Sequence, residues 1–420
     1  MPTSQKEGVP INSYFARQPI LDDNQRLYAY ELLFRPNPDK NESGQPLAFD
    51  GDRATMDVLE ALTWGGINKI TGGVPAFVNF TERLLLDEVA TLYSKEFLVV
   101  EVLENIHITN AVLDAIRELK HKGYKIALDD YWFRKEDSAL LSLCDIVKLE
   151  VDGSRKSYRN IVSVRQALVG TKCRLLAEKV ETLQVFEQSR RLGCTLFQGY
   201  FFAKPNIMGQ KRLSPLKLNQ VRLIRELARD EMDFEAMASI VKQDIGLTYK
   251  TLRLVNSAYY GLQNEVKSIN QALLLLGKNE LRKWLTVSAL NTLGEKKPSE
   301  LIIMSMTRAK FCESAASLLG RKRDGEAFFL SGLFSLLDTL TDNSLEDNLA
   351  QMPVPALTKR ALLEEKNIGR DTLDLIISME AGDWDTTAGL CEKLRLTDSQ
   401  VAEAYRAAIE WAQLFSEITH

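Results

Sequence analysis

The chain has 420 residues, of which 45% are hydrophobic and 26% charged, and its formal net charge at pH 7 is −4. This length exceeds one ordinary hydrophobic core, so we expect two domains, each able to bury its own interior. The net charge is too small to suggest the strongly charged tail of many nucleic-acid-binding proteins; it does not exclude nucleic acid, but we expect no such partner.

The N-terminus and the cysteines indicate the cellular compartment. Residues 1–8 lack the apolar core of a signal peptide, and no run approaches the ~18 apolar residues of a membrane-spanning helix. The five cysteines stand far apart with no Cys-x-x-Cys pair, which argues against a disulfide framework and a thiolate metal site. We therefore expect a cytoplasmic protein without membrane contact, whose cysteines are reduced and mostly buried.

The N-terminal part predicts a β-hairpin followed by a helix. Residues 14–21 and 27–35 are apolar-rich runs separated by a polar turn at residues 22–26. Residues 36–51 are rich in Pro, Asn, Asp and Gly, which is typical of a loop. The helix expected after this loop carries three apolar residues on one face, namely Ala54, Val58 and Leu62.

From about residue 75 to residue 205, short β-type runs alternate with stretches of helical spacing. Such alternation indicates a parallel sheet covered by helices. Six units of this kind, with two strands upstream, are enough to close an eight-stranded α/β barrel of the TIM type. The six runs are residues 75–79, 97–103, 124–130, 145–151, 174–180 and 195–202.

One helix of this region can be delimited residue by residue. Thr109 is a candidate N-cap and Gly123 stands where a C-terminal glycine belongs. Two later helices are expected to end in the same way at Gly170 and Gly193. The first of these helices has one apolar face, made by Val112, Ile116 and Leu119.

Beyond a polar and basic linker at residues 206–215, helical spacing dominates to the C-terminus. We therefore expect a first domain over residues 1–205 and an all-α domain over residues 206–420. In the last helix, Thr397 and Gln400 match a capping box. Its apolar stripe is Val401, Tyr405, Ala408, Ala412 and Phe415, and an earlier helix has Leu301, Met304, Cys312, Ala315 and Leu319 on one face.

In a barrel, the residues at the carboxyl ends of the strands point toward one mouth. A carboxylate at a single strand end is most often a surface residue or a helix cap, but seven strand ends here carry polar groups. They supply almost only oxygen ligands, and neither histidine nor cysteine is among them, which favours Mg²⁺, Mn²⁺ or Ca²⁺ over zinc. The residues are Glu31, Asn79, Glu101, Asp129, Asp130, Lys148, Glu178 and Gln198.

Two divalent cations held by shared carboxylates suit the attack of water on a phosphodiester, because they stabilise the entering and the leaving oxygen. Asp129, with Asp130 beside it, is placed to bridge two such cations. Lys148 and Glu178 are candidates to orient or deprotonate the water. The planar fork of Arg35 matches phosphate oxygens, while a surface ion pair is the ordinary alternative for a lone arginine.

Seven short motifs occur in order along the first half. They are AYELLFR at residues 29–35, VNFT at 78–81, EVLE at 101–104, ALDD at 127–130, VKLE at 147–150, AEKVET at 177–182, and QGY with KP at 198–205. Residues 12–205 thereby resemble the EAL-domain phosphodiesterases of cyclic di-GMP signalling, with Leu32 in place of the alanine of the name-giving motif.

The resemblance implies a TIM barrel that hydrolyses cyclic di-GMP to the linear dinucleotide pGpG with Mg²⁺ or Mn²⁺. It further implies roles in motility or biofilm control and leaves a homodimer open. Lys148 and Glu178 would be the catalytic pair that activates water. The implied metal ligands are Glu31, Asn79, Glu101, Asp129 and Asp130, and the implied substrate-binding residues are Gln18, Arg35 and Gln198.

The chain departs from the family pattern after the paired aspartates. Residues 131–138 contain no glycine, whereas the family has Phe-Gly-Thr-Gly there, so we expect a different and stiffer loop. Lys179 replaces a glycine and Glu150 an aspartate. Two hypotheses stay open: an active phosphodiesterase, or a cyclic di-GMP receptor or protein scaffold that has lost turnover. Retention of Lys148 and Glu178 favours the enzyme.

Three motifs of the second half resemble the HDOD domain, a helical relative of the HD phosphohydrolases that lacks their His and Asp ligands. They are residues 252–262, 269–272 and 275–277. This half has no histidine before His420, so we expect no metal site of the HD type and no catalysis. A regulatory role or the recruitment of a protein partner remains, and Lys267 and Ser268 lie either in a partner contact or in a solvated loop.

Overall fold

The structure is a computed structural model that describes residues 14–35, 51–65, 67–203, 234–257, 259–294, 297–350 and 352–419, with residues 220, 223, 224, 226 and 227. The linker expected at residues 206–215 lies outside the described residues. By its contacts the chain divides into two compact units, residues 1–201 with 377–406, and residues 202–376 with 407–420. Residues 377–406 thus belong with the first unit, which the sequence did not indicate. The expected boundary after residue 205 stays a prediction.

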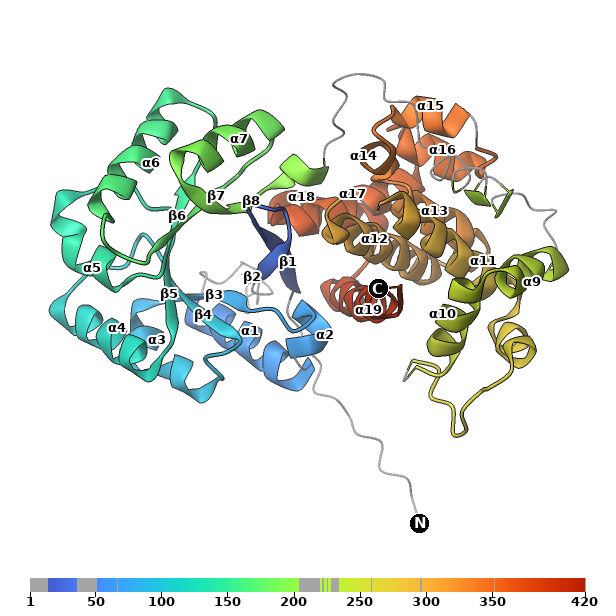
Figure 1. The fold of residues 1–420 in the computed structure, drawn as a ribbon, viewed down its shortest axis with the longest axis horizontal. Coiled ribbons are helices and arrows are strands. Elements are labelled where there is room, and N and C mark those ends of the chain that lie inside the picture. Colours follow the sequence, from blue (N-terminus) through green and yellow to red (C-terminus); the bar gives the residue numbers. More distant parts are fainter. Residues whose placement is uncertain are drawn as a thin grey trace, which may run out of the picture. The chain divides into compact units, whose positions relative to one another are not determined.

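The first unit is built on a closed eight-stranded barrel, which confirms the fold expected from the sequence. The strand that starts the barrel is antiparallel to both of its neighbours, whereas the other seven strands run parallel to one another. Helices lie outside the ring of strands (Figure 1). The strands are β1 Tyr14–Asp22, β2 Leu27–Arg35, β3 Ala76–Phe80, β4 Leu98–Val102, β5 Lys125–Leu128, β6 Ile146–Glu150, β7 Arg174–Glu178 and β8 Cys194–Gln198.

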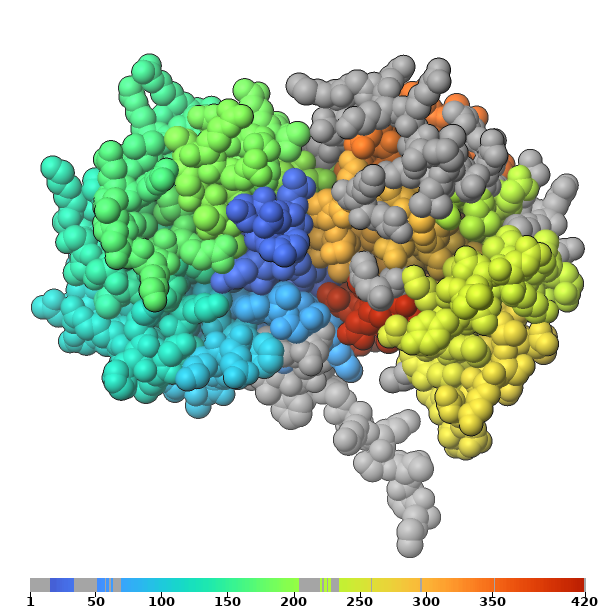
Figure 2. All heavy atoms as spheres, in the orientation of Figure 1, coloured from blue at the N-terminus to red at the C-terminus, as the bar shows by residue number. Residues whose placement is uncertain are grey.

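The expected hairpin of β1 and β2 is confirmed, and its turn is set by one side chain. Asp22 Oδ1 accepts hydrogen bonds from the backbone N–H groups of Asn24 and Arg26, both at 2.9 Å. Gln25 adopts a left-handed conformation with φ of 60° within the four-residue turn between the strands, residues 23–26. Asp23, Asn24 and Arg26 in this turn are exposed, and the hairpin to which they belong is dark blue in Figure 2.

The helices of the barrel begin and end largely where the sequence indicates. Thr109 caps its helix by accepting from Val112 N, and Gly123 and Gly193 are left-handed C-caps with φ of 93° and 108°. The expectation for Gly170 is wrong: that helix ends at Ala167 with Leu168 as its C-cap, and Gly170 lies in the turn beyond. These helices are α1 Gly51–Gly65, α2 Ile67–Thr71, α3 Glu82–Leu86, α4 Asn110–Lys122, α5 Ser138–Leu143, α6 Arg155–Ala167 and α7 Leu183–Leu192.

Short 3₁₀ helices complete the barrel region, at Val89–Leu92, Lys135–Asp137 and Tyr200–Ala203. The last of these shortens the strand expected over residues 195–202, because β8 ends at Gln198. The expected apolar face of α1 is confirmed, since Ala54, Val58 and Leu62 are buried.

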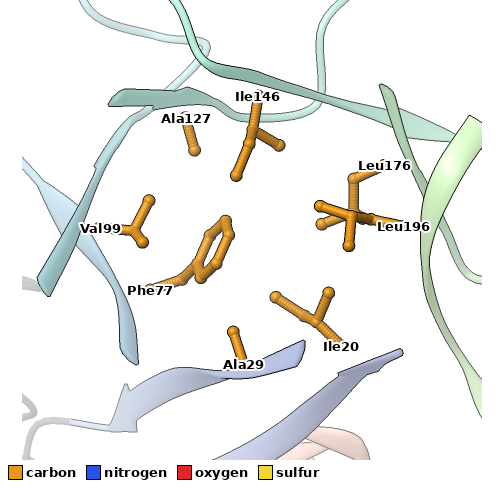
Figure 3. Packing of buried hydrophobic residues seen from close by; sticks show 8 residues of the cluster. All are labelled: Ile20, Ala29, Phe77, Val99, Ala127, Ile146, Leu176 and Leu196. Atoms are coloured by element: carbon orange, nitrogen blue, oxygen red, sulfur yellow. The ribbon is translucent and has the colours of Figure 1, made fainter. Parts of the chain in front are cut away.

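The barrel interior is filled by one apolar residue from each strand. The eight side chains point into the barrel and pack against one another (Figure 3). Because side chains alternate along a strand, the residue two positions farther toward the mouth also faces inward. The apolar residues are Ile20, Ala29, Phe77, Val99, Ala127, Ile146, Leu176 and Leu196.

From residue 220 on, every described element is a helix, which confirms the expected all-α region. The capping box of the last helix is confirmed by hydrogen bonds in both directions between Thr397 and Gln400. None of the described helices combines the length and the apolarity needed to cross a bilayer. The helices are α9 Phe234–Gln243, α10 Ile245–Val255, α11 Ile269–Leu293, α12 Ser299–Leu318, α13 Gly325–Leu333, α14 Leu337–Thr341, α15 Leu345–Ala350, α16 Ala356–Leu362, α17 Ile368–Ala381, α18 Trp384–Leu394 and α19 Asp398–Thr419.

Two details refine the helical expectations. The apolar stripe of α19 is buried along its whole length, as expected. The α12 helix has more than the one apolar face expected, because its residues from Glu300 to Ala309 are all buried. The five cysteines carry free thiols, and all but Cys173 are buried.

Candidate active site

A ring of polar side chains lies directly above the apolar interior of the barrel. Each member stands two residues from one of the apolar residues of Figure 3, on the side of the mouth. We call this set the polar ring, and every strand contributes one member to it. It consists of Gln18, Glu31, Asn79, Glu101, Asp129, Lys148, Glu178 and Gln198.

Lys148 is the hub of the polar ring. Its Nζ atom lies 2.8 Å from Asp129 Oδ1, 2.9 Å from Glu178 Oε1 and 3.2 Å from Glu31 Oε1. It also donates a hydrogen bond to Glu101. The Lys148 side chain is only 1% exposed, so four carboxylates surround one ammonium group that water hardly reaches.

The charges in the polar ring shift the pKa values of its members strongly. Burial alone would lower the pKa of Lys148, but the surrounding carboxylates outweigh burial and raise that pKa well above its usual range. Burial raises the pKa of Glu101 well above its usual range, against the attraction of Lys148. Lys148 therefore stays protonated, whereas the environment of Glu101 disfavours its ionised form.

Glu178 has a pKa close to neutrality. Burial is the main cause and raises the pKa to about 8, with help from the negative charges of Glu31 and Asp129 and against the attraction of Lys148. A carboxylate with such a pKa can take up and release a proton near physiological pH.

Two glutamines connect Glu31 to the start of the barrel. Gln198 Nε2 donates to Glu31 Oε2 and to Gln18 Oε1, each at 2.6 Å. Glu31 is therefore held from both sides, by Gln198 at one oxygen and by Lys148 at the other. The side chain of Arg35 lies outside the described residues, and its backbone ends β2.

The polar ring has the properties of a cation site. Three of its oxygens are buried and accept no hydrogen bond within the described part of the chain, namely Asn79 Oδ1, Glu101 Oε2 and Gln198 Oε1. One carboxylate oxygen each from Asp129, Asp130 and Glu178 lies within 4.8 Å of the others. Buried acceptors without donors are costly, and a divalent cation of the Mg²⁺ or Mn²⁺ type would satisfy them. The residues present therefore fit such a metal.

The backbone beside the site adopts unusual conformations. Asp130 and Lys179 have φ of 39° and 54°, in the left-handed region that favours glycine. Lys179, which stands where the family has a glycine, thus has a backbone conformation that glycine adopts more readily. Its Nζ atom lies 3.0 Å from Glu150 Oε2, so the two departures from the EAL motifs form one ion pair.

The glycine-free loop after Asp130 is fixed by hydrogen bonds to one of its own side chains and to a side chain of α6. Asn160 Nδ2 donates to Tyr131 O at 2.8 Å, and Asn160 Oδ1 accepts from Phe133 N at 3.0 Å. The hydroxyl of Tyr131 accepts from Arg134 N at 3.1 Å. No residue from Tyr131 to Ser138 has a positive φ, so this path needs no glycine. The role of Asn160 carried no sequence signal, because it belongs to no motif.

Together, the fold and the site define an α/β barrel protein with a ring of carboxylates around one lysine at its mouth. A model of the EAL domain matches residues 75–205, and a model of the HDOD domain matches residues 213–366. The chain is 35% identical over 410 residues to the uncharacterized protein YuxH of Bacillus subtilis, covering 95% of this chain and 97% of that protein.

The chain is also 35% identical over 411 residues to the cyclic di-GMP phosphodiesterase CdgJ of Vibrio cholerae, covering 97% of this chain and 94% of that protein. Among solved structures it is similar to the manganese and cyclic di-GMP complex of Klebsiella pneumoniae BlrP1, with 22% identity, a TM-score of 0.36, and coverage of 48% of this chain and 58% of that one. The chain belongs to the family of proteins that join an EAL domain to an HDOD domain.

Proposed function

We propose that the chain is a metal-dependent phosphodiesterase that hydrolyses cyclic di-GMP to linear pGpG. The observation that carries the proposal is the convergence of Lys148 with four carboxylates at the barrel mouth. The full-length similarity to a protein named as a cyclic di-GMP phosphodiesterase supports the choice of substrate.

Mg²⁺ or Mn²⁺ would be held by the carboxylates and the amide oxygen of the barrel mouth. When bound, such ions lower the pKa of a water molecule and stabilise negative charge on the phosphodiester oxygens. The buried acceptors Asn79 Oδ1 and Glu101 Oε2 support this assignment, since they lack other partners among the described residues. The proposed ligands are Glu31, Asn79, Glu101, Asp129 and Asp130.

Glu178 and Lys148 are the proposed catalytic pair. Glu178, with its pKa raised to about 8, accepts the proton of the attacking water at Oε2 or Oε1. Lys148 lies 2.9 Å from Glu178 Oε1 and orients that carboxylate by a charged hydrogen bond. As the water loses its proton, the Lys148 ammonium group stabilises the negative charge that develops beside it.

The proposed substrate contacts are made by Gln18, Arg35 and Gln198. Arg35 would pair with a phosphate through its guanidinium group. The helical half supplies no catalytic group and would regulate the barrel or bind a protein partner in bacterial cyclic di-GMP signalling in the cytoplasm.

The test measures hydrolysis of cyclic di-GMP by the full chain with Mg²⁺ or Mn²⁺, with pGpG separated by liquid chromatography. Glu178→Gln should lower kcat at least about a thousandfold, because it removes the proposed base. Glu187→Gln on α7 is the matched control, since Glu187 forms only a surface ion pair with Arg190 and should retain parent activity. Binding of cyclic di-GMP without any pGpG from the parent chain would refute the proposed reaction.

A further inference from the structure

Gln18, a member of the polar ring, contacts the tight turn between α17 and α18. Gln18 Nε2 donates a hydrogen bond of 3.1 Å to the backbone carbonyl of Glu380, near the end of α17. A Cβ atom placed on Gly382 would lie 3.1 Å from Leu33 Cδ1 and 3.9 Å from Gln18 Nε2. The turn therefore lies against the β1 and β2 hairpin within the first compact unit.

The turn has a defined geometry of its own. Gly382 has φ of 70° and donates to Met379 O at 3.0 Å, and Asp383 N donates to Ser378 O at 2.9 Å. This is the pattern of a helix end closed by a left-handed glycine. Asp383 then caps α18 by accepting from Thr386 N at 3.1 Å. The carbonyl of Glu380 is consequently held at a fixed position.

This carbonyl determines which end of the Gln18 amide faces the site. An amide nitrogen only donates and an amide oxygen only accepts. With Nε2 on the Glu380 carbonyl, Oε1 of Gln18 faces Gln198 and accepts its hydrogen bond at 2.6 Å. A reversed amide would set oxygen against the carbonyl and nitrogen against nitrogen, so both contacts would be lost.

Gln198 links the Gln18 amide to Glu31, a proposed metal ligand. Its Nε2 atom uses one hydrogen for Gln18 Oε1 and one for Glu31 Oε2. Gln198 is buried, and no other side-chain acceptor competes for these two hydrogens within the described contacts. The orientation of the Glu31 carboxylate thus depends on the orientation of the Gln18 amide, which in turn is set by its hydrogen bond to the turn.

We propose that the turn at residues 380–383 is a positioning element of the metal site. Through Gln18 and Gln198 it holds Glu31 in the orientation in which Glu31 binds the divalent cation. The turn lies beyond both matched domains, which end at residues 205 and 366. This inference rests on the proposed function only in assigning a metal to the polar ring, and Gln18 acts here as a positioning residue.

The experiment measures Mn²⁺ binding to the full chain by isothermal titration, without substrate. Gln18→Leu should raise the Mn²⁺ dissociation constant at least about tenfold, as is typical when a partner of a metal ligand is removed. Gly382→Ala should raise it roughly threefold to tenfold by pushing the turn away from Leu33 and Gln18. The double variant should bind like Gln18→Leu alone, because the turn acts through Gln18.

Gly320→Ala is the matched control. Gly320 ends α12 with the same φ of 70° and the same pair of backbone hydrogen bonds, but a Cβ there meets nothing within 4 Å. It should bind Mn²⁺ like the parent chain, and circular dichroism should show that all variants are folded.

The outcomes separate this inference from the proposed reaction. Equal dissociation constants for the parent chain, Gln18→Leu and Gly382→Ala would overturn the positioning role alone. A parent chain that binds Mn²⁺ and leaves cyclic di-GMP intact would overturn the reaction alone. A parent chain that binds no Mn²⁺ would overturn both.

Discussion

Lys148 Nζ lies 2.9 Å from Glu178 Oε1, and neither side chain is more than 10% exposed. In this pair, Glu178 is the proposed proton acceptor, and Lys148 is the cation that offsets the negative charge of the barrel mouth. Because four carboxylates depend on this one ammonium group, its removal affects the stability of the fold as well as the chemistry.

Lys148→Met should destabilise the metal-free chain by about 3–5 kcal/mol, because it leaves buried carboxylates without a cation. Saturating Mn²⁺ should recover a large part of this loss. Urea unfolding in the presence of a chelator and of Mn²⁺ measures both effects. Lys120→Met is the control, since Lys120 forms a partly exposed pair with Asp145 and should change stability by less than about 1 kcal/mol. Equal losses in the two variants would contradict the role of Lys148.

The pKa of Glu178 predicts how metal binding depends on pH. That pKa is about 8 in the folded, metal-free chain and ordinarily 4.5, so between these values the folded state holds a proton that the unfolded state has released. The metal-free fold should therefore lose stability as pH rises from 4.5 to 8. The positive charge of Mn²⁺ held by the neighbouring carboxylates favours the charged form of Glu178, so the affinity for Mn²⁺ should rise with pH up to about 8.

Isothermal titration with Mn²⁺ at several pH values between 6 and 8.5 checks this dependence. Glu178→Gln carries no titrating proton and should show a flatter profile. A parent affinity that does not change over this range would rule out the coupling.

Asn160 should decide whether the loop after Asp130 keeps its path. Asn160→Ala removes both hydrogen bonds to the backbone of Tyr131 and Phe133. We expect a loss of roughly 2–3 kcal/mol, since a buried carbonyl and a half-buried N–H lose their partner. Cyclic di-GMP hydrolysis should fall as well, because Tyr131 follows Asp130 directly.

Asn160→Asp gives a graded comparison. It keeps the acceptor for Phe133 N but sets a carboxylate oxygen against Tyr131 O, so it should also destabilise the chain. Thermal unfolding and kcat at saturating Mn²⁺ are the measurements. Parent values for both variants would show that the loop is held elsewhere.

Gly199, next to Gln198, should tolerate no side chain. Its φ is 138°, and a Cβ there would lie 2.3 Å from Val180 O and 2.5 Å from Val180 N. Gly199→Ala should therefore destabilise the barrel by more than about 3 kcal/mol or prevent folding. Gly170 also has a positive φ, of 88°, but a Cβ there would meet no atom within 4 Å. Gly170→Ala should therefore destabilise the chain by only about 1 kcal/mol. Similar melting temperatures for the two variants would contradict this reading.

Much of the barrel could be predicted from the sequence because side chains alternate along a strand. An apolar residue followed two positions later by a polar one, as in Ile146 and Lys148 or Leu176 and Glu178, indicates an inward face that ends at a mouth. Gln18 does not follow this pattern, because β1 is antiparallel to its neighbours and its inward polar residue precedes its apolar partner in the sequence.

The remaining features depend on contacts that no local pattern encodes. Asn160 sits on a helix with an ordinary spacing, and only the folded structure brings it to the backbone of Tyr131. A glycine at position 170 is typical of a helix end, but α6 already ends at Leu168, whose backbone N–H donates to the carbonyls of Val164 and Gln166. The contact of Gln18 with Glu380 joins residues whose surroundings in the sequence are unrelated.

The reversed first strand also sets the order in which a growing chain can complete its active centre. Gln18 leaves the ribosome well before both of its partners, since Gln198 follows 180 residues later and Glu380 follows 362 residues later. During synthesis the barrel cannot close before β8 exists, and the Gln18 amide has no fixed direction before α17 exists. A nascent or truncated chain that ends before residue 380 would thus hold a closed barrel in which Glu31 is not yet oriented, and synthesis of the turn at residues 380–383 would complete the site.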